Sequence, residues 1–200
     1  DKTFDIGNNG EITSAKFGIY AGEDIKANNG DVIPKDALIT FANCDNNGNL
    51  SFNCDLPIGF RWYAKEIATD EHYILSDAKY EFDTEYQGQD VKVIDIKVNN
   101  DKAIENNLIY GSVKGLKIDR ETQETIEGAT FGLFKSNTTE FTKENAILTV
   151  VTDKNGIFAF NNVPYGEYII KELKPADGYL DNEDTFTVTI KDNEQVVELT

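Results

Sequence analysis

The chain has 200 residues and a formal charge of -17 at pH 7, so nucleic acid and anionic membranes, which repel an acidic surface, are excluded as partners. Its length fits one large domain or two small ones. No stretch is apolar for long enough to span a membrane, and a single histidine leaves no Ser/His/Asp triad and no zinc site. Strand-forming residues between Asn-Gly and Asp-Gly turns predict an all-β protein that needs no cofactor and no metal.

Four short motifs occur twice in the same order, which indicates that a unit has been duplicated. The pairs are AKFGIY (15–20) with ATFGLF (129–134), CDNNGNLSF (44–52) with TDKNGIFAF (152–160), DLPIG (55–59) with NVPYG (162–166), and YAKEI (63–67) with IIKEL (169–173). Their spacing gives a unit of roughly ninety to a hundred residues, a normal domain size. We therefore expect one domain over residues 1–108 and a second over residues 109–200.

Each unit has the pattern of a β-sandwich, with short strands separated by turns. In the DNNG and DKNG turns, Gly48 and Gly156 supply the positive φ that such hairpins need. Insertions at 23–38 and 136–148 occupy equivalent places and are expected to form side loops that contain a helical turn. The expected strands are 15–20, 50–57, 60–67 and 91–100 in the first unit, and 111–119, 129–134, 157–164, 167–173, 186–190 and 195–200 in the second.

A glutamate stands where a strand should point a side chain into the core. Tyr168, Ile170 and Glu172 share one face, because alternate residues of a strand point to the same side. Burying a carboxylate is costly unless it is protonated or paired, so the alternative is a strand that ends or bulges before Glu172. Glu66 has the same phase in the first unit. A strand that ends or bulges before the glutamate would have to occur twice at equivalent positions. The repeat therefore favours two buried glutamates.

A buried acid needs a partner, and Lys117 is the candidate in the second unit. Val113, Gly115 and Lys117 share one face of the first strand of this unit, and this face is expected to point inward. Leu116 and Ile118 are also apolar. The opposite phase, with the lysine pointing outward from an edge strand, therefore stays open.

Cys44 and Cys54 are predicted to be free thiols, although exported proteins commonly form disulfides. A hairpin folded about Asn47 places Cys44 opposite Leu50 or Ser51, and Cys54 lies farther along the strand. That offset exceeds the Cα–Cα reach of a disulfide, which is below about 7 Å.

Five motifs follow one another along residues 111–179: G-x-V-x-x-x-K-x-D, E-G-A-x-F-x-L, D-x-N-G-x-F-x-F, V-P-x-G-x-Y-x-I-x-E and P-x-x-G-Y. This combination resembles the Cna B-type (collagen-adhesin B) domain, also called the Spa-type pilin-like or prealbumin-like domain. The resemblance covers the second unit and, more loosely, the first. It implies two tandem prealbumin-like, Ig-like β-sandwiches in an extracellular protein that is anchored to the cell wall of a Gram-positive bacterium.

The resemblance also implies an intramolecular isopeptide bond between a lysine on the first strand and an asparagine on the last. Lys117 would be the amine of the second unit, and Glu172 and Glu66 would be the proton shuttles. Burial favours a neutral amine, which can attack, and a protonated acid, which can polarise the carboxamide while ammonia leaves. The acceptor of the second unit is expected beyond Thr200.

For the first unit, the acceptor is expected at the end of the strand predicted for residues 91–100. Asn100 has the phase of the apolar residues before it and is the candidate, with Asn99 as the fallback. The lysine of this unit is expected on a strand ahead of Asp1, with Lys2 as a substitute.

Three classes of function fit these features to different degrees. The leading one is a structural stalk module of an adhesin or pilin, whose partners are the neighbouring domains of the same surface protein. The alternative is an adhesive module that binds a host extracellular-matrix protein or a glycan through the insertion at 23–38, since loops on rigid scaffolds carry recognition. An enzyme of prealbumin-like fold is disfavoured because the chain has no histidine cluster, so a single-turnover crosslink is the only reaction expected.

Overall fold

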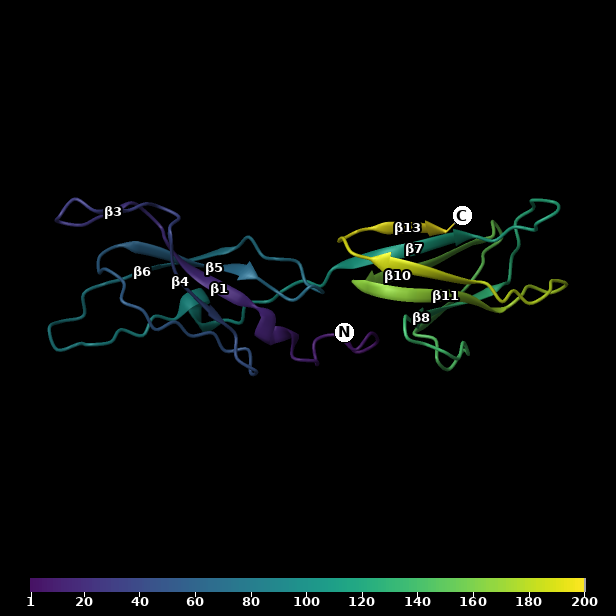
Figure 1. The fold of residues 1–200 in the computed structure, drawn as a ribbon, viewed down its shortest axis with the longest axis horizontal. Helices are drawn as coiled ribbons and strands as arrows, with labels where there is room; N and C mark the ends of the chain where they lie inside the picture. Colours follow the sequence, from purple (N-terminus) through teal and green to yellow (C-terminus); the bar gives the residue numbers. More distant parts are fainter. Residues whose placement is uncertain (200) are drawn as a thin grey trace. The chain divides into compact units, whose positions relative to one another are not determined.

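The computed structural model describes residues 1–199, with only the backbone described at Asp101. The chain is almost entirely β and divides into two compact units (Figure 1). Gly7–Asn107 forms one unit, the N-terminal domain, and Asp1–Ile6 joins the residues from Leu108 onward in the other, the C-terminal domain. The seam lies one residue from its predicted position, and the first six residues belong with the second domain.

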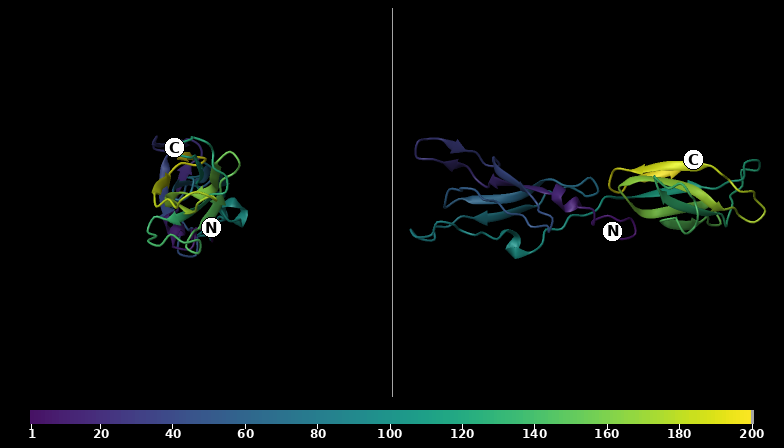
Figure 2. Two further views of the ribbon diagram at one scale, coloured as in Figure 1. Left: turned by 90° about the vertical axis from the view of Figure 1, so that its right-hand side faces the viewer. Right: turned by 60° about the horizontal axis from the view of Figure 1, so that its bottom comes forward.

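The C-terminal domain is a β-sandwich of two sheets (Figure 2). In the first sheet, β7 (Tyr110–Leu116) lies between β10 (Ile157–Pro164) and β13 (Val196–Leu199), antiparallel to β10 and parallel to β13. The second sheet is antiparallel and has the order β12 (Thr185–Ile190), β11 (Gly166–Lys174), β8 (Thr130–Lys135), β9 (Leu148–Val151). The inner faces of both sheets contribute the core, as the alternation of apolar residues along each strand requires.

The N-terminal domain has one four-stranded antiparallel sheet, with strands equivalent to those of the second sheet above. Its order is β4 (Leu38–Asn43), β1 (Lys16–Ala21), β5 (Arg61–Ala68), β6 (Lys79–Asp83). In register, Glu66 on β5 pairs with Phe17, and Glu172 on β11 pairs with Phe131. The repeated motifs therefore occupy equivalent places in the two domains, and the two glutamates lie at matching positions.

The second layer of the N-terminal domain has no paired strands, so the strands predicted at 50–57 and 91–100 are wrong. Both segments run as irregular chain, and the second ends in η2 (Val98–Asp101). The physical reason is the lack of a partner. Their counterparts in the other domain, β10 and β13, both form hydrogen bonds to β7, and no strand of residues 7–107 takes the place of β7.

The two insertions differ from one another. Residues 23–38 form a small hairpin of β2 (Ile25–Lys26) and β3 (Val32–Ile33), so the helical turn expected there is wrong. In residues 136–148 the backbone N–H of Ala146 donates to the Thr142 carbonyl at 3.1 Å, which closes one turn of helical type. A further short 3-10 helix, η1 (Glu11–Ser14), leads into β1.

Candidate functional site

Lys117 and Glu172 meet in the C-terminal domain. The amine Nζ lies 3.1 Å from Oε2 of the carboxylate, and the two side chains are 21% and 2% exposed. Val113 of the same strand face is fully buried, whereas Leu116 and Ile118 are 53% and 36% exposed. The inward phase predicted for the lysine is therefore the one that the strand adopts.

Gly115 explains how the core fits around this pair. A Cβ at Gly115 would come within 2.2 Å of the Phe158 ring, which stacks on Phe131 with 4.1 Å between ring centroids. Phe131 is the cross-strand neighbour of Glu172, so the two stacked rings lie next to the pair. The missing side chain makes room for an aromatic ring that borders the site.

One oxygen of Glu172 has no partner among residues 1–199. Oε1 is buried and accepts no hydrogen bond there, while Oε2 is held by Lys117. A buried polar atom without a partner is costly, so a donor that reached Oε1 would stabilise this site.

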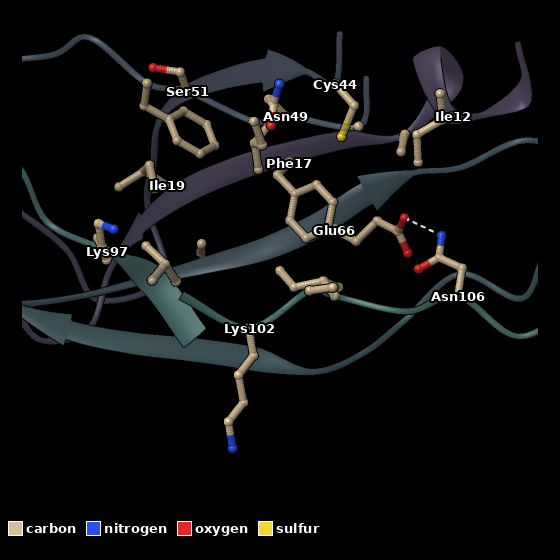
Figure 3. Close-up of a pocket in the computed structure, with 18 of the residues that line it drawn as sticks. Ile12, Phe17, Ile19, Cys44, Asn49, Ser51, Glu66, Lys97, Lys102 and Asn106 are labelled. Carbon is tan, nitrogen blue, oxygen red and sulfur yellow. Dashed lines mark hydrogen bonds between the residues drawn. The ribbon is translucent and has the colours of Figure 1, made fainter. Parts of the chain in front are cut away.

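Glu66 has the complementary set of contacts in the N-terminal domain (Figure 3). Its side chain is almost completely buried, and Oε1 accepts a hydrogen bond from Nδ2 of Asn106 at 2.7 Å. Oε2 accepts one from the backbone N–H of Ser76 at 2.9 Å. Nδ2 of Asn106 also donates to Oγ1 of Thr69 at 2.8 Å, which fixes the carboxamide in place.

The residue brought to Glu66 is Asn106, and not the predicted Asn100. Asn100 is exposed within η2 at φ 52°, and the Asn99 side chain donates to carbonyls at the end of the same helix. The prediction assumed that the last strand ends at residue 100, whereas the chain continues past η2 before it reaches the glutamate. The available signal was position, because Asn106 lies one residue before the end of the first unit at Asn107.

No amine contacts Glu66 in the described part of the chain. Lys2, the predicted substitute, is exposed and lies in Asp1–Ile6, which belongs to the C-terminal domain. One site thus contains an acid with an amine, and the other an acid with a carboxamide. In both, the acid lies within hydrogen-bond distance of its partner.

The thiols of Cys44 and Cys54 are both free, as predicted. Burial raises the pKa of both, and the nearby Glu66 and Asp45 carboxylates raise the pKa of Cys44 further. Among residues 1–199, no group of three His, Cys, Asp or Glu side chains is arranged to hold a metal ion, and no helix is long and apolar enough to cross a membrane.

Comparison with known proteins relates both domains to one family. The model of the SpaA prealbumin-like fold domain matches residues 2–105 and 111–200. The collagen adhesin of Staphylococcus aureus is 30% identical over 98 residues, which is 48% of this chain and 8% of that protein. The trypsin-resistant surface T6 protein of Streptococcus pyogenes serotype M6 is 36% identical over 73 residues, which is 36% of this chain and 12% of that protein. The chain therefore spans only a small part of these relatives.

Solved structures show the same fold. The Bacillus anthracis TIE protein superposes with a TM-score of 0.64 at 22% identity, over 97% of this chain and 31% of that one. A C-terminal fragment of the pilus adhesin SpaC from Lactobacillus rhamnosus GG superposes with a TM-score of 0.52 at 14% identity, over 96% of this chain and 83% of that one. With the family match over nearly every residue, the chain belongs to the SpaA family of prealbumin-like domains and carries two of them in tandem.

Proposed function

We propose that the two domains are stalk modules of a cell-wall-anchored surface protein of a Gram-positive bacterium, and that Lys–Asn isopeptide bonds stabilise them. The observation that carries the proposal is the complementary content of two equivalent sites. Glu172 holds a lysine amine at 3.1 Å, and Glu66 holds an asparagine carboxamide at 2.7 Å. The names of the relatives, a collagen adhesin and a surface protein, support an extracellular location.

The reaction would join a lysine and an asparagine that both contact the same glutamate. The lysine Nζ attacks Cγ of the asparagine, the new C–N bond forms, the bond to Nδ2 breaks and ammonia leaves. The glutamate takes the proton that the amine gives up and passes it to the departing nitrogen. In the N-terminal domain Asn106, in place of Asn100, is the proposed acceptor. In the C-terminal domain the acceptor would donate to the free Oε1 of Glu172, as Asn106 donates to Glu66.

Such a bond suits a module that must resist extension. The first and last strands of the C-terminal domain, β7 and β13, are parallel neighbours held together by hydrogen bonds. A covalent link between the two strands would bear a pulling force in place of the hydrogen bonds between β7 and β13. By analogy with a disulfide that closes a loop of similar length, it would also stabilise the domain by about 4 kcal/mol.

The adhesive alternative finds no support in the insertions. Residues 23–38 contain no aromatic side chain that could anchor a ligand. In the other insertion, Phe141 packs edge-on against Phe134 with 5.0 Å between ring centroids. The proposed partners are therefore the neighbouring domains of the same surface protein.

The test is tandem mass spectrometry of the full-length protein after proteolysis. Lys117 is expected in a crosslinked peptide pair that is one ammonia lighter than the sum of its parts, and Glu172→Gln should abolish it. Lys114→Ala is the matched control, because Lys114 lies on the exposed face of the same strand and its loss should leave the crosslink intact. An unmodified Lys117 in the wild-type protein, or a crosslink that survives Glu172→Gln, would contradict the proposal.

A further inference from the structure

The chain contains four Asn-Gly pairs, at residues 9–10, 29–30, 47–48 and 155–156. In such a pair the backbone nitrogen of the glycine can attack the carboxamide carbon of the asparagine, because glycine has no Cβ that shields the nitrogen. The pair itself is the same at all four places. Any difference in reactivity between them must therefore come from the fold around each pair.

In three of the pairs a turn holds the backbone nitrogen of the glycine. The N–H groups of these glycines donate to the carbonyl three residues earlier, from Gly30 to Ala27 at 3.0 Å, from Gly48 to Asp45 at 3.0 Å and from Gly156 to Asp153 at 2.8 Å. An N–H in such a bond keeps its proton and its direction. Attack on the asparagine therefore requires the turn to open first, which lowers the rate by the population of the open form.

Two of these pairs are restrained further. Gly156 is buried, and a Cβ there would come within 2.4 Å of the Lys117 carbonyl oxygen. The carboxamide of Asn29 is bound at both ends, since Nδ2 donates to Oδ2 of Asp31 at 2.6 Å and Oδ1 accepts the Asp31 backbone N–H at 3.1 Å. A carboxamide held in this way cannot turn toward the Gly30 nitrogen without losing two hydrogen bonds.

Asn9–Gly10 has a different backbone environment. Among residues 1–199, the N–H of Gly10 donates no hydrogen bond, and a Cβ built on Gly10 would meet no atom within 4 Å. Both residues are exposed, so water reaches the pair. Neither residue lines the pocket over the sheet in Figure 3, so the environment of the pair does not depend on that pocket.

The carboxylate of Glu11 holds Asn9 in place. Its Oε2 accepts the backbone N–H of Asn9 at 2.6 Å, and its Oε1 accepts Nδ2 of the same residue at 3.3 Å. Burial works to raise the pKa of Glu11, but the backbone N–H groups of Gly7 and Asn9 outweigh it and lower the pKa to about 2. Glu11 is therefore an acceptor at neutral pH, and it keeps the Asn9 side chain directed toward the residues that follow, where the Gly10 nitrogen lies.

We propose that Asn9 is a site of spontaneous modification, where the Gly10 nitrogen closes an imide ring onto the side chain and water opens it to aspartate or isoaspartate. The Gly10 nitrogen attacks Cγ of Asn9, a C–N bond forms, the bond to Nδ2 breaks, and the proton of the Gly10 nitrogen leaves with Nδ2 as ammonia. One water molecule then adds to either carbonyl of the ring and breaks one of its two C–N bonds.

The product changes the start of the N-terminal domain. A carboxylate at residue 9 cannot donate to Glu11 and adds a second negative charge beside it. Isoaspartate also adds one methylene group to the main chain directly ahead of η1. The reaction uses neither Lys117 nor Glu172, so it stands apart from the proposed function.

The test compares the four pairs within one molecule. The complete chain is incubated at mildly alkaline pH, folded in buffer and unfolded in guanidinium chloride, and peptide mapping by tandem mass spectrometry measures aspartate and isoaspartate at each pair. In the unfolded chain all four should convert at similar rates. In the folded protein Asn9 should stay within about threefold of its unfolded rate, whereas Asn29, Asn47 and Asn155 should each slow at least about tenfold.

Two variants test the cause. Asn9→Gln, whose longer side chain would have to close a six-membered ring, should lose the product at residue 9 and leave the other three pairs unchanged. Asp45→Ala removes the acceptor of the Asn47 and Asn49 backbone N–H groups, so it should raise the rate at Asn47 toward the unfolded value and leave Asn9 as it was.

The outcomes that would overturn the proposal are specific. One is an Asn9 that converts as slowly in the folded protein as the other three asparagines, and another is an Asn47 that stays slow in Asp45→Ala. Loss of ammonia at Asn9 lies within a single peptide, whereas the crosslink of Lys117 joins two. Failure of one reaction is therefore read separately from failure of the other.

Discussion

At the scale of single residues, the environment of the Lys117–Glu172 pair depends on the absence of a side chain at Gly115. Gly115 has no side chain, and the Phe158 ring occupies the space where a Cβ would be. That ring stacks on Phe131. A glycine in a strand usually weakens it, and here the loss is offset by close aromatic packing.

Gly115→Ala should destabilise the C-terminal domain by about 1–3 kcal/mol, because the added methyl group overlaps the Phe158 ring. Urea unfolding followed by far-UV circular dichroism measures this. Phe158→Leu in the same chain should remove part of the penalty, so the two substitutions should couple in a double-mutant cycle. Additive effects would show that the ring is not what excludes the side chain.

The two cysteines give a second test at this scale. Because burial raises the pKa of both thiols, a smaller fraction of each is thiolate at a given pH, and alkylation should be slower in the folded protein than in the unfolded chain. Thiol titration of the unfolded, unreduced protein should find both Cys44 and Cys54. Finding neither would mean that they form a disulfide.

At the scale of elements, the same turn is built twice from the same residues. Asp45 Oδ1 accepts the backbone N–H groups of Asn47 and Asn49, each at 2.8 Å, and Asp153 accepts the equivalent pair in the second domain. The Asn49 backbone N–H is the main reason that the pKa of Asp45 lies below its ordinary value. This stabilisation of the turn is present above the ordinary pKa of an aspartate and is lost as the pH falls through the lowered one.

Asp153→Ala should destabilise the C-terminal domain by about 1 kcal/mol, because two backbone N–H groups lose their acceptor. Asp153→Asn keeps an oxygen in the same place and should cost less. Chemical denaturation of the three proteins gives the comparison. Equal losses for the two variants would mean that the carboxylate charge matters more than the acceptor geometry.

At the scale of the whole molecule, the two domains have unequal cores. In the C-terminal domain the buried core draws on both sheets of a closed sandwich, whereas the N-terminal core is smaller and lies beside an open groove. Since burial of apolar surface is the main favourable term in folding, the N-terminal domain should be the less stable. Trp62 is the only tryptophan of the chain, is fully buried and lies in that domain.

Trp62 fluorescence should therefore report an unfolding transition at a lower denaturant concentration than the main transition seen by far-UV circular dichroism. Coincident transitions by both probes would contradict the unequal cores.

The sequence by itself determined what depends on local periodicity. Alternation along a strand placed Glu66 and Glu172 on inward faces, and the repeated motifs set them at equivalent positions. The turn glycines, Gly48 and Gly156, follow from the need for positive φ. Each of these features is decided by residues within a few positions of one another, so no distant partner is needed to predict it.

Only the tertiary structure decided what depends on distant partners. A strand forms only where another strand pairs with it, so residues 50–57 and 91–100 have the right composition and yet form no strand. The position of Asn106 beside Glu66 follows from how an irregular segment folds back over the sheet, which no strand phase can show. Asp1–Ile6 packs with the second domain for the same reason, because apolar contacts far along the chain outweigh its place in the repeat.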